Sequence, residues 1–129
     1  MFWSINYLAV VVAAFSIFAL GGVWYSPKVF GTIWQREAQL ESKEAHPKRI
    51  FIISFFFALI SALAFAFLLG PMPNLHTALQ TGTIVGLLVA TSFGINYQFA
   101  NRSLKLFLID GGYHAAQFII YGLIFGLWN

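Results

Sequence analysis

Residues 104–128 read LKLFLIDGGYHAAQFIIYGLIFGLW, and this stretch decides the fold that the other segments must complete. It has the length of a bilayer-spanning helix, about 20 residues or more at about 1.5 Å rise each. It nevertheless carries Asp110 and His114 within its apolar run. A carboxylate in hydrocarbon costs at least about 2.5 kcal/mol on insertion scales, so other helices must supply partners for these groups.

Two stripes of side chains run along this helix when residues are placed about 100° apart. The polar stripe consists of Asp110, His114, Gln117 and Tyr121. The second stripe, about a third of a turn away, consists of the small residues Gly111, Ala115, Gly122 and Gly126. Small residues let another backbone approach closely, so we predict helix packing on the second stripe and any function on the first.

The composition is that of an integral membrane protein. The chain has 129 residues, 60% of them hydrophobic and 9% charged, with a mean hydropathy of +0.80, whereas soluble domains carry about 25% charged residues. We predict an all-α membrane protein with one domain over residues 1–129. Its four transmembrane helices are expected at about 4–25, 48–69, 76–99 and 104–128, with a cytoplasmic loop at about 26–47.

The basic residues indicate the orientation of these spans. Five of the seven Lys and Arg residues lie in or beside the loop after the first span, and the other two follow the third span. By the positive-inside rule both loops face the cytoplasm, so both termini are expected outside a bacterial inner membrane. The net charge of +3 is therefore a topology signal and not a nucleic-acid surface. The absence of cysteine excludes disulfides and cysteine-bound metals.

The first span and the loop after it carry two weaker signals. No basic residue precedes the first span, so we expect a retained helix and not a cleaved signal. Asn6, near its start, is expected to be an interfacial residue, with a binding role as the less favoured alternative. In the loop, apolar residues recur at helical spacing: Phe30, Ile33, Trp34 and Ala38. This spacing favours an amphipathic segment lying on the membrane surface, although a solvated connector fits nearly as well.

The third span carries a ladder of small residues at successive i+4 positions: Ala78, Gly82, Gly86, Ala90 and Gly94. Such a ladder is typical of close helix packing. Polar residues gather on the opposite side: Thr77, Thr81, Ser92 and Asn96. Since both faces are expected to contact neighbouring helices, we expect this helix to be central in the bundle.

The predicted orientation brings most polar residues of the spans to one depth, in the inner leaflet. The residues expected at this level, with Asp110 and His114, are Trp24, Tyr25, Ser54, Ser92 and Asn96. A carboxylate and an imidazole at i and i+4 can form a charge-assisted hydrogen bond. The sequence therefore predicts an Asp–His network that nearby amides and hydroxyls complete.

Four short motifs resemble a known family: Asn6-Tyr7-Leu8-Ala9, Trp24-Tyr25-Ser26-Pro27, Lys105-Leu106-Phe107-Leu108-Ile109 and Asp110-Gly111-Gly112-Tyr113-His114. In this order they are similar to domain of unknown function 1761 (DUF1761), a family of small bacterial membrane proteins. The resemblance spans nearly the whole chain and includes Gly31 after Tyr-Ser-Pro. It implies four membrane helices, and it marks Asn6, Asp110, Tyr113 and His114 as family features. It implies no reaction.

Three hypotheses of function remain. The favoured one is a structural or accessory membrane subunit in which the Asp–His network fixes helix packing. The alternative is a small homo-oligomeric transporter or channel that uses Asp110 and His114 to handle a proton or cation, with the ion or solute unknown. An enzyme is least favoured because no nucleophile motif or phosphate loop accompanies the pair. We expect no metal or cofactor, since His46, His76 and His114 lie on different segments. The expected partners are the lipid bilayer and further copies of the chain.

Overall fold

The computed structural model describes residues 4–39 and 47–128. Within these ranges the chain forms five helices: α1 (Tyr7–Trp24), α2 (Gly31–Ala38), α3 (Pro47–Leu69), α4 (Leu75–Phe99) and α5 (Leu104–Leu127). The four long helices begin and end within a few residues of the predicted spans, and α2 lies where the amphipathic segment was expected. Lys43, Glu41, Glu44 and His46 of the loop lie outside the described residues.

Three of the helices begin at a side chain that caps them. Asn6 accepts a hydrogen bond from the backbone N–H of Ala9, Asn74 accepts from that of Thr77, and Ser103 accepts from that of Leu106. Each cap satisfies one of the N–H groups that a helix start leaves without a partner. Asn6 therefore has a local structural role as the N-cap of α1.

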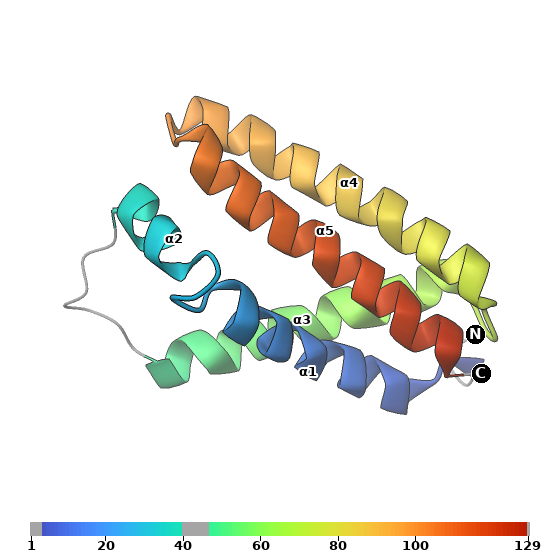
Figure 1. The fold of residues 1–129 in the computed structure, drawn as a ribbon. Helices are drawn as coiled ribbons and strands as arrows, with labels where there is room; N and C mark the ends of the chain where they lie inside the picture. Colours follow the sequence, from blue (N-terminus) through green and yellow to red (C-terminus); the bar gives the residue numbers. More distant parts are fainter. Residues whose placement is uncertain (1–3, 40–46, 129) are drawn as a thin grey trace.

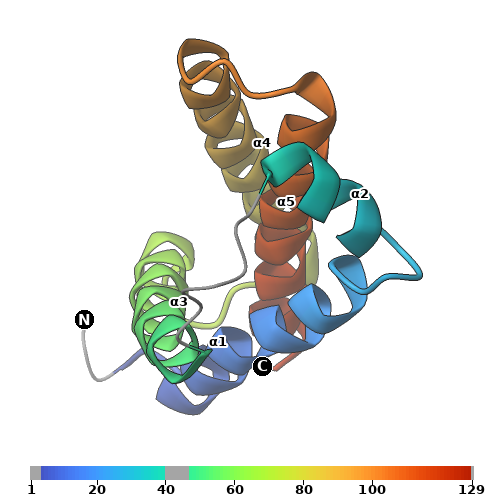
Figure 2. The same cartoon turned by 90° about the vertical axis from the view of Figure 1, so that its left-hand side faces the viewer.

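The long helices form two pairs (Figure 1). The helices α4 and α5 are an antiparallel hairpin, α1 packs with α3, and α5 contacts α1, α2, α3 and α4. Figure 2 shows α5 beside α4 and α2, with α3 apart from α4. The expectation that the third span is central was wrong. Its hydroxyls at Thr83, Thr91 and Ser92 are exposed and bond to carbonyls of their own helix, so they need no neighbouring helix.

The contact between α4 and α5 is made by small residues on both helices. A Cβ atom built on Gly82 would collide with the carbonyl oxygen of Phe118, and one on Gly122 would collide with that of Ala78. Gly86 also lies against a backbone, that of Ala115, although less closely. The ladder of the third span thus faces the small stripe of residues 104–128, and the two backbones touch without intervening side chains.

Helix α2 is held at one end of the bundle, beside α5. Its first residue, Gly31, lies so close to the backbone of Tyr25 and Ser26 that a Cβ atom would not fit. At its other end the Arg102 guanidinium donates a 2.7 Å hydrogen bond to the Ala38 carbonyl. The negative end of the helix dipole also stabilises a cation at this position.

Three helices of the described chain are long and apolar enough to cross a membrane: α1, α3 from Lys48 onward, and α4. Helix α5 has 24 residues, a sufficient length, but its apolar run is interrupted by Asp110, His114 and Gln117.

Candidate functional site

The Asp110 carboxylate accepts hydrogen bonds from two tyrosine hydroxyls that belong to two different segments of the chain. Tyr25, just beyond the end of α1, donates to Oδ1 at 2.6 Å, and Tyr97 of α4 donates to Oδ2 at 2.5 Å. Burial, and then the hydrogen bond to Asp110, raise the pKa of the Tyr25 hydroxyl above its usual range, so this group stays protonated and remains a donor. Both oxygens of the carboxylate thus accept hydrogen bonds, one from the end of α1 and one from α4.

Two further bonds join α1 to the same turn of α5. The Trp24 indole N–H donates to the Ile109 carbonyl at 2.9 Å, and the Tyr113 hydroxyl donates to the Ile17 carbonyl at 2.8 Å. The rings of Tyr25 and Tyr113 lie 5.3 Å apart between centroids. The C-terminal part of α1 is therefore fixed to α5 through side chains of both helices.

His114 is half-buried, and its ring is held by neighbours on two helices. Its Nδ1 lies 2.8 Å from Oε1 of Gln117. The ring stacks on Phe93 of α4, with centroids 4.7 Å apart and planes inclined by 5°. Tyr113 contacts it edge-on at a centroid distance of 5.1 Å. These contacts set the plane of the imidazole ring.

A chain of hydrogen bonds continues from His114 into the core. Gln117 donates through Nε2 to the Tyr121 hydroxyl at 3.0 Å. Tyr121, which is completely buried, lies 3.1 Å from the Ser61 hydroxyl of α3. Ser61 donates to the Ala58 carbonyl of its own helix at 3.0 Å. The polar stripe of α5 thus reaches α3 as well as α1 and α4.

The predicted Asp–His network is not present in the described structure. Both carboxylate oxygens of Asp110 accept from tyrosines, whereas His114 bonds to Gln117, one turn further along α5. The i, i+4 spacing places the two groups on one face, but hydroxyls from neighbouring segments reach the carboxylate. The polar stripe is therefore divided into two sets of bonds, one around Asp110 and one that runs from His114 to Ala58.

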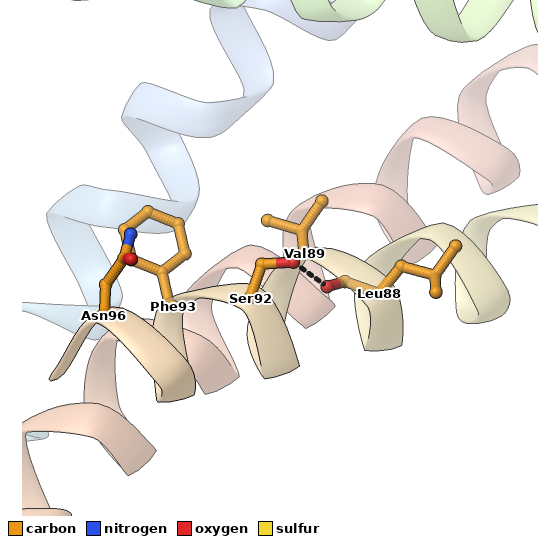
Figure 3. Close-up of a pocket in the computed structure, with 5 residues that line it drawn as sticks. All are labelled: Leu88, Val89, Ser92, Phe93 and Asn96. Carbon is orange, nitrogen blue, oxygen red and sulfur yellow. Dashed lines mark hydrogen bonds between the residues drawn. The ribbon is translucent and has the colours of Figure 1, made fainter. Parts of the chain in front are cut away.

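The serines and the asparagine expected at the depth of Asp110 do not join either set. Ser92 donates to the Leu88 carbonyl and lines a groove on α4 with Asn96, as Figure 3 shows. This groove of about 250 Å³ is also lined by Leu88, Val89 and Phe93. Ser54 makes no side-chain hydrogen bond within the described residues. A predicted common depth therefore does not imply contact, because side chains at one level of a helix bundle can point away from one another.

Two partners of the polar stripe, Tyr97 and Ser61, were not predicted from the sequence. A signal for Tyr97 does exist, because α4 and α5 are joined by a short connection and run side by side. Tyr97 and Asp110 both lie within about two turns of it, where facing residues of a helical hairpin meet.

The described residues contain no group of three or more His, Cys, Asp and Glu side chains that could hold a metal ion.

The buried indole Nε1 of Trp34, in α2, has no hydrogen-bond partner in the described part of the chain. Its ring packs edge-on against Tyr25 at 5.4 Å. The Asp110 side of the site is thus covered by aromatic rings from α1 and α2.

The fold and its polar core define an all-helical protein with helices of membrane-spanning length and composition. A family model described as "protein of unknown function (DUF1761)" matches residues 8–126, which is nearly the whole chain. The chain belongs to this family, and the resemblance of its motifs is confirmed. Comparison with curated proteins and with solved structures found no match.

Proposed function

We propose that this chain is a multi-pass membrane protein with a structural or accessory role, in which the polar stripe of α5 fixes the packing of the bundle. The observation that carries this proposal is that Asp110, Gln117 and Tyr121 each bond to a neighbouring side chain of the same molecule. The bonds reach the end of α1, and helices α3 and α4. Interhelical hydrogen bonds in membranes stabilise by about 0.6 to 2 kcal/mol each and fix the register of helices.

The proposal includes α5 as a fourth span. Its 24 residues are long enough to cross the hydrocarbon core, and its Asp110 charge is met by two hydroxyls instead of lipid. Four spans place both basic loops on the cytoplasmic side and both termini outside a bacterial inner membrane. The exposed apolar residues of α3, including Phe51, Phe56 and Phe57, then face acyl chains.

Single cysteines test this topology, because the chain contains no cysteine of its own. In bacterial spheroplasts an impermeant thiol reagent should label His76→Cys and Trp128→Cys from outside. Gln35→Cys and Gln98→Cys should react only after lysis, since both lie in or beside the basic loops. All four positions are exposed. Labelling of Trp128→Cys only after lysis would contradict a fourth span.

A second candidate function is a small homo-oligomeric transporter or channel. The observation that favours it is the groove on α4, because Phe93 both lines the groove and stacks on His114. A second copy that covers the exposed side of α4 would enclose Ser92, Asn96 and this aromatic contact within an oligomer. Neither Asp110 nor His114 lines the groove in the single chain.

Purified protein in liposomes separates the two functions. The structural role predicts that a proton or potassium gradient decays at the rate of empty liposomes, and that His114→Gln leaves this rate unchanged. Asp110→Asn should lower the stability of the protein in detergent without altering the gradient. A flux well above the empty-liposome rate that is lost in His114→Gln would reject the structural role in favour of the transporter.

A further inference from the structure

In the hydrogen-bond chain from His114 to Ala58, every donor points toward Ala58, because the Ala58 carbonyl at the end of the chain is an acceptor. The Ala58 carbonyl can only accept, and Ser61 donates its one proton there. The Tyr121 hydroxyl lies 3.1 Å from that of Ser61 and donates to the Ala58 carbonyl at 3.5 Å, so its proton points toward α3 whichever of the two hydroxyls donates to the other. Its oxygen then accepts from Nε2 of Gln117. This leaves Oε1 of Gln117, which is only an acceptor, facing Nδ1 of His114.

The direction of the chain fixes the tautomer of His114. Because Oε1 of Gln117 can only accept, the proton of the neutral imidazole lies on Nδ1. Nε2 then carries a lone pair, and no hydrogen bond in the described part of the chain involves it. In a neutral histidine of this tautomer, Nε2 is the only ring atom that can take up a proton.

Protonation at Nε2 would leave every bond of the chain intact. Imidazolium donates from both nitrogens, so Nδ1 continues to donate to Gln117. The face of Phe93, stacked at 4.7 Å, favours a cation on the ring. The Asp110 carboxylate lies one turn away on the same helix and attracts that cation without a direct bond. The surroundings of His114 thus accommodate both charge states in one conformation.

We propose that Nε2 of His114 is a reversible proton-binding site inside the helix bundle, with Gln117 as the residue that positions it. This goes beyond a packing role for the polar stripe, since Asp110 is held by two donors while His114 changes its charge. The other titratable groups near it are Asp110, Tyr113 and Tyr121 of α5, and Tyr97 of α4. The middle segments of α1 and α3, residues 8–23 and 50–69, contribute no titratable group.

Nitrogen-15 NMR of the histidine-labelled full chain in lipid vesicles tests this site. The signals of His114 are identified by their loss in His114→Gln. At alkaline pH we expect a protonated Nδ1 and an unprotonated Nε2, and on acidification the Nε2 signal should shift to that of a protonated nitrogen while Nδ1 stays protonated. A neutral ring with its proton on Nε2, or a ring that stays neutral until the protein unfolds, would overturn the proposal.

Gln117→Leu provides the test of positioning. Removal of the acceptor should replace the single tautomer by a mixture of the two, whereas a purely structural glutamine would leave the tautomer unchanged. If Gln117→Leu does not fold, Tyr121→Phe serves the same purpose, because it removes the hydroxyl that orients the Gln117 amide. The liposome assay tests the proposed function independently, since His114 can bind a proton in a protein that moves none across the membrane.

Discussion

Replacing Asp110 with alanine is expected to lower the free energy of unfolding in detergent by about 3 kcal/mol. The carboxylate accepts from Tyr25 and Tyr97, and hydrogen bonds to a charged group contribute about 1.5 to 3 kcal/mol each in net terms. Its removal also leaves two hydroxyl donors without their acceptor among aromatic rings. Reversible unfolding in a graded mixture of mild and denaturing detergent, followed by circular dichroism, measures the loss.

Phenylalanine variants apportion this effect between the two tyrosines. Tyr25→Phe and Tyr97→Phe should each lower the free energy of unfolding by about 1 kcal/mol, since the carboxylate keeps its other donor. Ser92→Ala is the matched control, because that exposed hydroxyl bonds only to its own helix, and its effect should lie within about 0.5 kcal/mol. If Asp110→Ala were no more destabilising than Ser92→Ala, the carboxylate would not hold the helices together.

The helices could be predicted from the sequence because their signals are local. Apolar runs of sufficient length indicated the four long helices. Pro27, Pro71 and Pro73 lie between helices, since proline cannot continue a helix. The short α2 was indicated by apolar residues at helical spacing. Small residues at i+4 spacing indicated a close helix contact, and Gly82 and Gly86 lie at that contact.

The pairing of polar groups could be predicted only in part. It depends on how each helix is rotated about its own axis relative to its neighbours, and no local sequence pattern determines this rotation. Periodicity placed Asp110, His114 and Gln117 on one face of α5, but it did not determine which neighbour each would bond to. The two hydroxyls that meet Asp110 come from residues 85 and 13 positions away along the chain. Their approach depends on how α1 and α4 cross α5, and backbone contacts at glycines occur in the α4–α5 crossing.

The two stripes of α5 therefore act together. The small stripe allows α4 to come close enough for Tyr97 and Phe93 to reach the polar groups of α5. Tyr97 then donates a hydrogen bond to Asp110, and Phe93 stacks on His114. A change at the contact of the small residues should consequently disturb both sets of bonds.

Gly82→Val is expected to lower the free energy of unfolding by about 3 kcal/mol, the upper end of the usual range for overpacking. A Cβ atom at this position would collide with the carbonyl oxygen of Phe118, and a backbone atom cannot turn aside as the end of a flexible side chain can. The two helices must therefore separate along the contact. Unfolding in mixed detergent measures the loss, and tyrosine fluorescence should report the displaced Tyr97.

Gly22→Val is the matched control, since it places the same side chain on a long helix where no other atom lies within 4 Å. Its effect should lie within about 0.5 kcal/mol, as for other exposed substitutions. The comparison removes the general consequences of adding a branched residue to a helix and isolates the collision with Phe118. Equal stability of Gly82→Val and Gly22→Val would mean that α4 and α5 are not in backbone contact, and the bonds of Asp110 to Tyr97 and of His114 to its stacked ring would lose their structural basis.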